Sequence, residues 1–419
     1  MDIERIVREV DSLRSWGVEV LKKMVSIPTI NPPGENYGEF VQYAKEVLAS
    51  IGMEVKVYEV PRRVVERKNP ELAPYPRYIL VARAGKGSRV LEINGHYDVV
   101  PPGSGWSRDP FKPVIENNKL YGRGAVDMKG GIASAIIAAR ALIDSGAIDE
   151  LDGSVELLLV PDEEIGGETG TGYALESGIV KPSYVVIAEP SGVDRVWIGH
   201  RGAVWGFVEV FGRQCHASTP WQGINAFTYL ARIAIALEER YGKEISERVS
   251  RYEYDDERSA RPTIAVGGEV RGGAKINIVP GYFAASIDRR LIVEERPEDV
   301  EREISEFIER VVKELGVEGL RAAFRPVHHM PPSITDPDTP LVRGILEACA
   351  RVVGSRPRTV VCSGGLDAWY YTTRGIPAVT FGPGPTDTAH VADEYVDLDQ
   401  VTAVAKVFAI LALEILGRR

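Results

Sequence analysis

The sequence predicts an α/β protein, in which a sheet has helices on both faces and a second, α+β domain is inserted into the first. Two observations support this fold class. Apolar runs of strand length alternate with segments of helical periodicity in the first half of the chain. That alternation stops after residue 196 and resumes near residue 330. We therefore predict one domain from residues 1–196 and 330–419 and an inserted domain over residues 197–329.

The chain is expected to open with two helices, over residues 8–25 and 37–51, where apolar side chains recur at helical spacing. A glycine pair begins a further segment of strong helix formers at residues 130–143. Several strand-like runs are almost continuously apolar, which is typical of strands covered on both faces. The strand-like runs are residues 53–60, 78–84, 90–94, 155–160 and 184–188.

The middle third has a different, α+β pattern of elements. Strands are expected over residues 196–211, 263–266 and 282–291, and helices over residues 225–240 and 297–315. The earlier pattern returns after a Pro-Pro pair at 331–332. The elements expected there are helices over residues 341–352 and 398–416 and strands over residues 359–361 and 378–381.

Charge and composition exclude several classes of partner. The 419-residue chain carries 60 acidic and 50 basic side chains, a formal net charge of −10, whereas nucleic acid and anionic membranes require a basic surface. The N-terminus lacks the apolar core of a signal peptide, and no apolar run approaches the ~20 residues that cross a bilayer. Three widely spaced cysteines argue against a disulfide scaffold. We predict a cytoplasmic protein with neither a nucleic-acid nor a membrane partner.

The first candidate site residues follow the apolar run at 90–93. The sequence there reads Asn-Gly-His-Tyr-Asp, and His96 and Asp98 point to the same side if the strand continues. An imidazole beside a carboxylate is typical of a metal-bound histidine whose second ring nitrogen donates to an acceptor. A buried His–Asp hydrogen bond without a metal explains this pattern equally well.

A glycine-rich segment at residues 122–131, Gly-Arg-Gly-Ala-Val-Asp-Met-Lys-Gly-Gly, contains Asp127. Its glycines are not spaced as in a dinucleotide-binding loop, and a carboxylate there would repel a pyrophosphate. Flanking glycines allow the backbone to approach a ligand closely. Asp127 is therefore a candidate ligand, and the alternative is a capping residue of the following helix.

Acidic residues also follow two other predicted strands. Residues 162–164, Asp-Glu-Glu, end the 155–160 run, and Glu189 ends the 184–188 run. Three consecutive carboxylates after a buried strand are costly without a cation, although a solvated loop is the alternative. Ligands bind at the carboxyl ends of strands in open α/β sheets. His390 lies in a last motif, Ala-His-Val-Ala-Asp-Glu.

Together these motifs supply two imidazoles and three carboxylates. Nitrogen and oxygen ligands without thiolate suit Zn, Co or Mn. Five ligands are too many for one tetrahedral ion with an open position, and they suffice for two ions if Asp127 bridges. One of the adjacent residues Glu163 and Glu164 can then bind metal while the other faces the metal-bound water. The candidate ligands are His96, Asp127, Glu164, Glu189 and His390.

These motifs, in this order, resemble those of the co-catalytic zinc aminoacylases and carboxypeptidases. The resemblance runs from residue 94 to residue 394 and is closest to the acetylornithine deacetylase and succinyl-diaminopimelate desuccinylase branch. It extends to Trp-Ser-Arg-Asp-Pro-Phe at 106–111 and to Gly-Arg-Gln-Cys-His-Ala-Ser-Thr-Pro at 212–220. It implies a mixed-sheet catalytic domain of the zinc-exopeptidase type and an inserted dimerisation or lid domain.

The resemblance also implies roles for the residues of the first domain. Asp98 would stand behind His96, Glu163 would be the general base, and the peptide bond between Val126 and Asp127 would be cis. Two ions would share Asp127. One ion would be held by His96, Asp127 and Glu189, and the other by Asp127, Glu164 and His390.

Further residues are implied to act on the substrate. His216 would reach the active site of the partner subunit in a homodimer and stabilise the tetrahedral intermediate there. Asn277 and Arg290 would hold the acyl or carboxylate end of the substrate. Gly364 and Gly365 would line the pocket.

One segment departs from the branch that the chain resembles most. Where those deacylases often have Ser-Asp-Ala-Arg, this chain has Leu-Asp-Ala-Trp at residues 366–369. Trp369 is therefore expected to line the pocket in place of an arginine, which favours an apolar acyl group or a peptide side chain. His328 and His329, near the predicted domain boundary, are interpreted as surface or hinge residues.

The predicted function is metal-assisted hydrolysis of the amide bond of an N-acyl-amino acid. Two divalent ions per subunit are expected, zinc first and cobalt or manganese otherwise. A carboxypeptidase or dipeptidase of the same family, acting on a short peptide, is the alternative. A catalytically silent metal-binding scaffold is an alternative of another class, and Glu163 argues against it because a scaffold has no use for a base that faces the metal.

Overall fold

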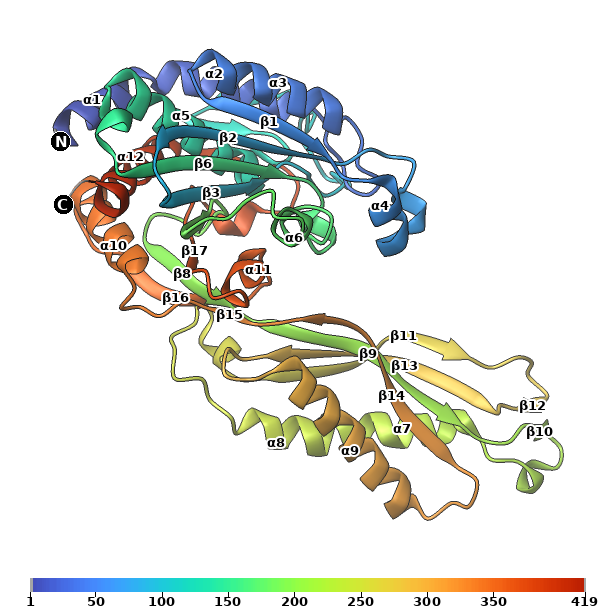
Figure 1. Cartoon of the computed structure of the whole chain (residues 1–419). Helices are drawn as coiled ribbons and strands as arrows, with labels where there is room; N and C mark the ends of the chain where they lie inside the picture. Colours follow the sequence, from blue (N-terminus) through green and yellow to red (C-terminus); the bar gives the residue numbers. More distant parts are fainter. Residues whose placement is uncertain (1–2, 418–419) are drawn as a thin grey trace. The chain divides into compact units, whose positions relative to one another are not determined.

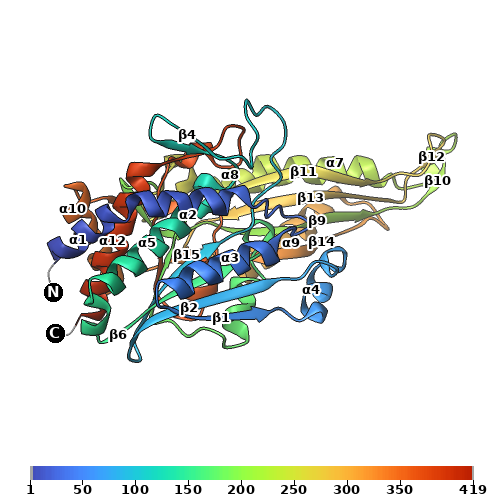
Figure 2. The ribbon, with the colours of Figure 1, turned by 90° about the horizontal axis from the view of Figure 1, so that it is seen from above.

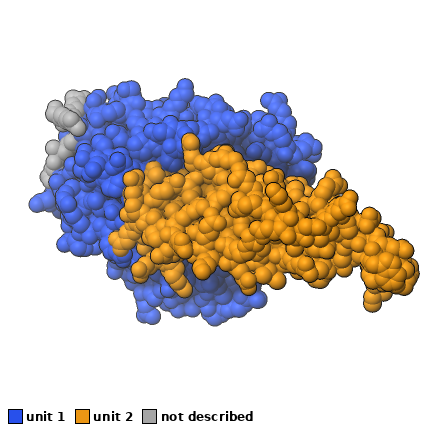
Figure 3. Space-filling model, turned by 90° about the horizontal axis from the view of Figure 1, so that it is seen from below, with its two compact units in different colours: residues 1–198, 335–359, 366–419 blue, residues 199–334, 360–365 orange. Residues whose placement is uncertain are grey.

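The computed structural model describes residues 3–417, and the chain folds into two units (Figures 1 and 3). Unit 1 contains the residues up to 198, residues 335–359 and the residues from 366 onwards. Unit 2 contains residues 199–334 and 360–365. The limits predicted for an inserted domain, 197–329, lie close to those of the longer segment of unit 2. Among the described residues, no helix combines the length and the apolarity that a bilayer crossing needs.

A mixed sheet forms the centre of unit 1. Its strand order is β1-β2-β6-β3-β7-β17-β8, and β15 and β16 also pair with β8. β6, β3, β7 and β17 run parallel, whereas the flanking pairs are antiparallel. The strands are β1 (Glu54–Glu59), β2 (Tyr78–Lys86), β3 (Val90–His96), β6 (Gly153–Val160), β7 (Tyr184–Ile187), β8 (Arg195–His200), β15 (Ser333–Ile334), β16 (Arg358–Cys362) and β17 (Ala378–Thr380).

Helices cover both faces of this sheet, as predicted. α3 contacts β1 and β2, and α5 and α12 contact β3 and β6, while Figures 1 and 2 show α2 beside α3 and α5. On the other face, α4 and α6 pack against apolar side chains of β2 and β6 in one core cluster. The helices are α1 (Ile3–Ser12), α2 (Arg14–Ser26), α3 (Tyr37–Ser50), α4 (Arg62–Lys68), α5 (Gly130–Asp144), α6 (Thr171–Glu176), α10 (Pro340–Val353), α11 (Ala368–Thr372) and α12 (Leu398–Leu416).

The covered sheet explains the apolar runs in the sequence. All eight residues of β6 are buried, because neighbouring side chains point to opposite faces and both faces meet helices. A smaller antiparallel sheet of unit 1 joins β18 (Tyr395–Asp397), β5 (Lys119–Tyr121) and β4 (Val114–Glu116).

Unit 2 is built on an antiparallel sheet with the order β11-β13-β9-β14. Its strands are β11 (Thr263–Gly272), β13 (Tyr282–Leu291), β9 (Gly202–Phe211) and β14 (Arg321–Met330). The helices α7 (Ala226–Ala236), α8 (Gly242–Ser246) and α9 (Pro297–Leu315) lie along one face (Figure 1). Side chains of α7, α9, β9 and β13 form its apolar core. A separate pair joins β10 (Cys215–His216) and β12 (Ile278–Val279).

His328 and His329, interpreted as surface or hinge residues, are both partly exposed. Both lie within β14, a strand that was not predicted and that continues to Met330. The ring of His328 stacks on Trp205 of β9 with a centroid distance of 5.2 Å, and His329 Nε2 lies 3.0 Å from Glu301 Oε2. These cross-strand and helix contacts fix both imidazoles inside unit 2.

Candidate metal centre

Three neighbouring parallel strands of unit 1 carry candidate ligands where they end. His96 is the last residue of β3. Glu163 and Glu164 follow β6, and Glu189 follows β7. Because the strands are ordered β6-β3-β7, the residues that follow them gather at one edge of the sheet.

Two loops bring the remaining candidate ligands to the same place. Asp127 lies in the turn Ala125–Lys129, which begins after Gly124 and leads into α5. Gly124 has a φ of 81°, a left-handed conformation that favours glycine. His390 lies in the loop before β18 and also has a positive φ, 63°, which is uncommon for a residue with a side chain.

The five candidate ligands form two groups that share Asp127. His96 Nε2 lies 3.1 Å from Asp127 Oδ1 and 3.1 Å from Glu189 Oε1. His390 Nε2 lies 3.1 Å from Asp127 Oδ2 and 3.1 Å from Glu164 Oε1. Within each group the candidate ligand atoms lie within 4.8 Å of one another. The two oxygens of Asp127 thus face different imidazoles, which is the arrangement of a carboxylate that bridges two ions.

The chemistry and spacing of these atoms fit divalent cations. Donor atoms on one tetrahedral ion at 2.0–2.1 Å stand about 3.3 Å apart, close to the spacing observed. His96 Nδ1 lies 3.0 Å from the carbonyl oxygen of Asp98 and 3.4 Å from its Oδ1. Both of these atoms are acceptors, so Nδ1 donates the ring proton to them, and Nε2 is the nitrogen that would bind a cation together with the carboxylates.

Negative charge is concentrated around the two imidazoles. Burial opposes protonation of His96, but Glu189 and Asp127 outweigh it and raise its pKa well above the usual value. Hydrogen bonds with Asp127 and Glu164 raise the pKa of His390 to about 10. Burial, followed by repulsion from Asp127, raises the pKa of Glu189 to about 7. These directions have one cause, an excess of carboxylates in a buried site, and cations relieve it.

Glu163 and Glu164 are held in place through their backbone. The N–H of Glu163 donates to Asp98 Oδ1 at 3.2 Å, and the N–H of Glu164 donates to Asp98 Oδ2 at 3.3 Å. Asp98 therefore joins the imidazole of His96 to the loop that carries the predicted base. Burial raises the pKa of Glu163 well above the usual value, which brings it closer to the range that suits a general base.

Glu394 supports the turn of Asp127, and the sequence interpretation had given it no role. Glu394 Oε1 accepts the N–H groups of Val126 at 3.0 Å and Asp127 at 3.2 Å, while Oε2 pairs with Arg123. The predicted cis bond between Val126 and Asp127 was misplaced by one residue, since the cis bond joins Asp127 to Met128. Asp127 and Met128 both have non-helical φ and ψ angles, so the irregular backbone begins at Asp127.

The structure places His216 and Asn277 together in unit 2. His216 in β10 pairs with Ile278 in β12, and the N–H of Ala217 donates to the carbonyl oxygen of Asn277 at 3.0 Å. The side chain of His216 is exposed, and its Nδ1 accepts the N–H of Ser218 at 3.1 Å.

The other predicted substrate residues also belong to unit 2. Arg290 on β13 donates to both carboxylate oxygens of Asp288, at 2.8 and 2.9 Å. Gly364 and Gly365 follow β16, and a side chain at Gly365 would collide with that of Met330. Their predicted contact with substrate stays a prediction.

Trp369 lies in α11 of unit 1, half-buried. Its ring stacks on Tyr370 with a centroid distance of 3.8 Å, and the hydroxyl of Tyr370 donates to the carbonyl oxygen of Gly166 at 2.7 Å. The indole is therefore linked through one residue to the turn that follows Glu163 and Glu164.

Buried polar side chains beneath this turn were missed from the sequence. Asn31 and Arg77 had no predicted role, and Asp162 was noted only as part of its motif. Asn31 precedes Pro-Pro-Gly, a turn sequence that could have drawn attention to it. Arg77 carries no comparable signal.

Comparison with protein families decides where the chain belongs. The model of peptidase family M20/M25/M40 matches residues 93–414, which is more than half of the chain and includes every candidate ligand. The chain belongs to this family. It is therefore a metal-dependent hydrolase that acts on amide bonds, as the motifs predicted.

Curated relatives match this M20 family chain over nearly its whole length. The succinyl-diaminopimelate desuccinylase of Nitratiruptor sp. is 28% identical over 400 residues, 93% of this chain and 97% of the relative. That of Wolinella succinogenes is 28% identical over 411 residues, 96% of this chain and 99% of the relative.

Solved structures of peptidases share the fold. A metallo-carboxypeptidase of Sulfolobus solfataricus superimposes with a TM-score of 0.71 at 22% identity, over 95% of this chain and 99% of that structure. A dipeptidase of Saccharomyces cerevisiae gives a TM-score of 0.72 at 18% identity, over 99% and 98% of the two chains. The mixed-sheet α/β fold predicted from the sequence is confirmed.

Proposed function

We propose that this M20 family hydrolase removes the acyl group from an N-acyl-amino acid at a site that holds two divalent cations. The observation that carries the proposal is the position of Asp127, whose two oxygens each lie 3.1 Å from a different imidazole. The two groups of ligand atoms share only this residue. Deacylation is favoured over peptide cleavage because the full-length curated relatives reported above are named desuccinylases.

The chain's own residues perform the proton transfers of this reaction. Bound cations supply Lewis-acid polarisation of the amide carbonyl and lower the pKa of a water toward ~7. Glu163 removes a proton from the attacking water, whose oxygen forms the new bond to the acyl carbon. The C–N bond then breaks, and Glu163 returns that proton to the departing amine. Asp98 fixes the backbone of Glu163 during both transfers.

Zinc is the metal that we propose first. The candidate ligands are imidazole nitrogens and carboxylate oxygens, without a thiolate, and each group supplies three protein ligands. A catalytic zinc ion with three protein ligands keeps a position for water or substrate. Cobalt and manganese accept the same donors, so metal analysis after reconstitution distinguishes the three.

An apolar acyl group is the substrate feature that the sequence favours. Trp369 replaces an arginine, and its ring stacks on Tyr370, which contacts the turn after Glu164. Arg290 and Asn277 are proposed to hold the acyl or carboxylate end of the substrate. A dipeptidase or carboxypeptidase activity is the second candidate, because the same indole suits an apolar peptide side chain.

We also propose that two copies of the chain associate through unit 2. β11 is an edge strand of its sheet, and large apolar side chains of α7 and β11 are exposed: 52% for Phe227, 54% for Ile235 and 54% for Val270. An edge strand with exposed apolar residues is suited to pairing with a second copy.

A cytoplasmic location agrees with cysteines that form no disulfide among the described residues.

A substrate panel tests the proposed reaction. The protein is stripped with a chelator, reconstituted with zinc or cobalt, and assayed against N-acetyl, N-succinyl and N-formyl amino acids and against dipeptides. We expect N-acyl-amino acids with apolar groups to give the highest kcat/KM. A clear preference for dipeptides would replace the deacylase with the peptidase, and activity that survives complete metal removal would contradict both.

Replacement of Glu163 tests the base. Glu163→Gln keeps the shape of the side chain but removes the group that accepts the proton. We expect the variant to bind the wild-type number of metal ions and to lose about 10³-fold or more in kcat, a general-base effect combined with mispositioned water. Activity within tenfold of wild type would show that another residue is the base.

A further inference from the structure

Two buried carboxylates lie directly beneath the turn that carries Glu163 and Glu164. One belongs to Asp98, which accepts both backbone N–H groups of these residues. The other belongs to Asp162, the residue that precedes them. Neither carboxylate is part of the two candidate ligand groups. These two residues fix the position of the turn, because Asp98 binds its backbone N–H groups and Asp162 is the residue with which it begins.

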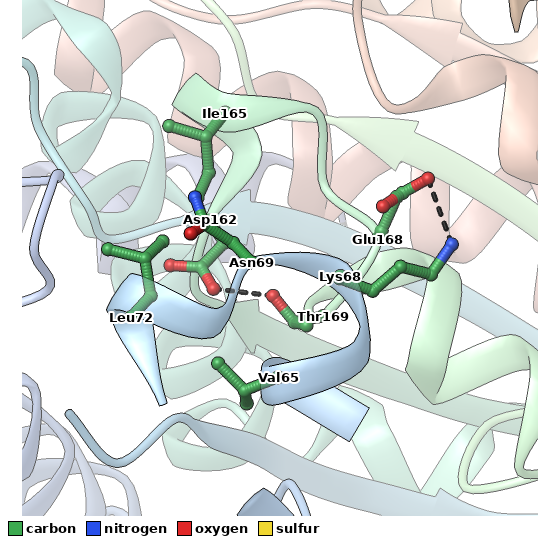
Figure 4. Close-up of a pocket in the computed structure, with 8 residues that line it drawn as sticks. All are labelled: Val65, Lys68, Asn69, Leu72, Asp162, Ile165, Glu168 and Thr169. Atoms are coloured by element: carbon green, nitrogen blue, oxygen red, sulfur yellow. Dashed lines mark hydrogen bonds and ion pairs between the residues drawn. The ribbon is translucent and has the colours of Figure 1, made fainter. Parts of the chain in front are cut away.

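Asp162 is held from several sides. It is 1% exposed and has a φ of 66°, so its backbone occupies a left-handed conformation that needs outside support. Its carboxylate accepts Tyr37 Oη at 3.0 Å and Arg77 Nε at 2.8 Å, and it also accepts the hydroxyl of Thr169. Figure 4 shows the last of these contacts, with Asp162 and Thr169 at the wall of a small cavity between this loop and the segment of Val65 and Leu72.

Asn31 is the residue that connects the two carboxylates. Its Nδ2 donates to Asp98 Oδ2 at 2.8 Å and to Asp162 Oδ1 at 3.1 Å. The side chain is buried, and the backbone N–H is fixed by the carbonyl oxygen of Val99 at 2.9 Å. Since ionised carboxylates offer no proton, the amide nitrogen and not the amide oxygen must face them. Consistent with this orientation, Asn31 Oδ1 has no hydrogen-bond partner among the described residues.

A primary amide is specifically suited to this place. Its nitrogen carries two N–H groups, so one atom donates to both carboxylates and screens them from each other without adding a charge. Arg77 donates to Asp162 through Nε, and its terminal nitrogens donate to the backbone carbonyls of Leu72, Tyr75 and Pro33 instead of to Asp98. Without Asn31, the carboxylates of Asp98 and Asp162 would lose the hydrogen-bond donor that they share below the turn.

We propose that Asn31 is a positioning residue that fixes the carboxylate of Glu163 through Asp98 and Asp162. The proposal rests on the proposed function, in which Glu163 moves the proton. Asn31 touches neither substrate nor the reacting atoms in this role. It acts because a misplacement of about 1 Å in a catalytic group costs on the order of 10²-fold in rate.

The substitution Asn31→Asp tests the proposal, because it preserves shape and replaces both donors with an acceptor. In the zinc-reconstituted protein we expect kcat to fall about 10²-fold, with KM within threefold of wild type and the metal content of wild type. Asn36→Asp is the matched control. It introduces the same change in the same loop, where Asn36 is exposed and its side chain donates to the carbonyl oxygen of Pro28. We expect its kcat to equal that of wild type.

A kcat of Asn31→Asp within threefold of wild type would overturn the proposal, and so would a loss fully explained by lost metal or lost folded protein. Metal content by elemental analysis and the thermal unfolding midpoint are therefore measured on the same samples. If Asn31→Asp does not accumulate as folded protein, the uncharged Asn31→Ser takes its place under the same criteria. Glu163→Gln is assayed in parallel. An active Glu163→Gln overturns the proposed function, whereas an inactive Glu163→Gln with an active Asn31 variant overturns only the role of Asn31.

Discussion

Glu92 is a buried acid in the sheet that the proposed reaction does not use. It is fully buried on β3, opposite Glu156 of β6, and it accepts a hydrogen bond from Tyr371. Glu92 Oε2 and Glu156 Oε1 are buried and have no hydrogen-bond partner among the described residues. One proton shared between the two carboxyl groups supplies the missing donor. Burial, followed by repulsion from Glu156, raises the pKa of Glu92 well above the usual value, which also favours the protonated form.

This protonated acid predicts a pH dependence of stability. Because the pKa of Glu92 is raised in the folded state, its contribution is fully present below its ordinary pKa and is lost as pH rises toward the folded-state value. Each tenfold difference in the acid dissociation constant between the folded and unfolded states changes the free energy of unfolding by about 1.4 kcal/mol. Glu92→Gln, which is neutral at every pH, is expected to gain stability relative to wild type as the pH rises above the ordinary pKa of a glutamate. Denaturant unfolding of both proteins at several pH values measures this, and a pH-independent difference would contradict the assignment.

The contact between α5 and the end of β7 shows how an element sets the site. Gly131 lies in the first turn of α5, and a side-chain carbon there would stand 1.9 Å from the carbonyl oxygen of Ala188. Ala188 immediately precedes Glu189. The helix can approach the strand end this closely only because residue 131 has no side chain, and the approach brings the turn of Asp127 toward Glu189.

Gly131→Ala is therefore expected to disturb both stability and metal binding. The added methyl group meets backbone, which cannot rotate away, so the expected destabilisation is about 1–3 kcal/mol. Displacement of Glu189 is expected to weaken the binding of one of the two ions. Calorimetric titration with zinc measures this loss of affinity. Gly38→Ala is the control. Gly38 lies at an exposed position of α3, and a side-chain carbon there would stand 3.7 Å from Tyr78, so this substitution is expected to stabilise by up to about 1 kcal/mol. Equal zinc affinity in the two variants would contradict this account.

The same scale shows which parts of the fold could be predicted. α9 and α12 begin and end where the sequence predicted, since their helical periodicity is long and α9 ends at a glycine of positive φ. β14 was missed because Arg321, Arg325 and other polar residues interrupt any apolar run, and only one of its ten residues is buried. Four of the candidate ligands could be selected because each ends or follows a strand or lies in a glycine-rich turn, whereas His390 was selected through its motif.

The supports of the site could not be predicted in this way. Asn31 meets Asp98 and Asp162 across separations of 67 and 131 residues. Glu394 meets the backbone of Asp127 across 267 residues. A backbone N–H or a buried amide leaves no periodic signal in the sequence, so these contacts appear only once the chain is folded.

At the scale of the whole molecule, the proposed chemistry is divided between the two units. Every candidate ligand and Glu163 belong to unit 1, whereas His216, Asn277 and Arg290 belong to unit 2. Among the described residues, the exposed side chain of His216 forms its hydrogen bonds with Ser218 of the same unit. If two copies associate through unit 2, each can supply this imidazole to the other.

Mixing of two inactive variants tests that exchange. His216→Ala keeps the base but lacks the imidazole, and Glu163→Gln keeps the imidazole but lacks the base, so each homodimer is expected to be inactive. A mixed dimer contains one site in which Glu163 of one chain meets His216 of the other. Random association makes half of the dimers mixed, so activity is expected to recover to about a quarter of wild type. The controls are each variant alone and a mixture at a protein concentration below the dissociation constant of the dimer. If the mixture stays inactive although sedimentation shows mixed dimers, His216 does not act in the partner's site, and unit 2 serves association alone.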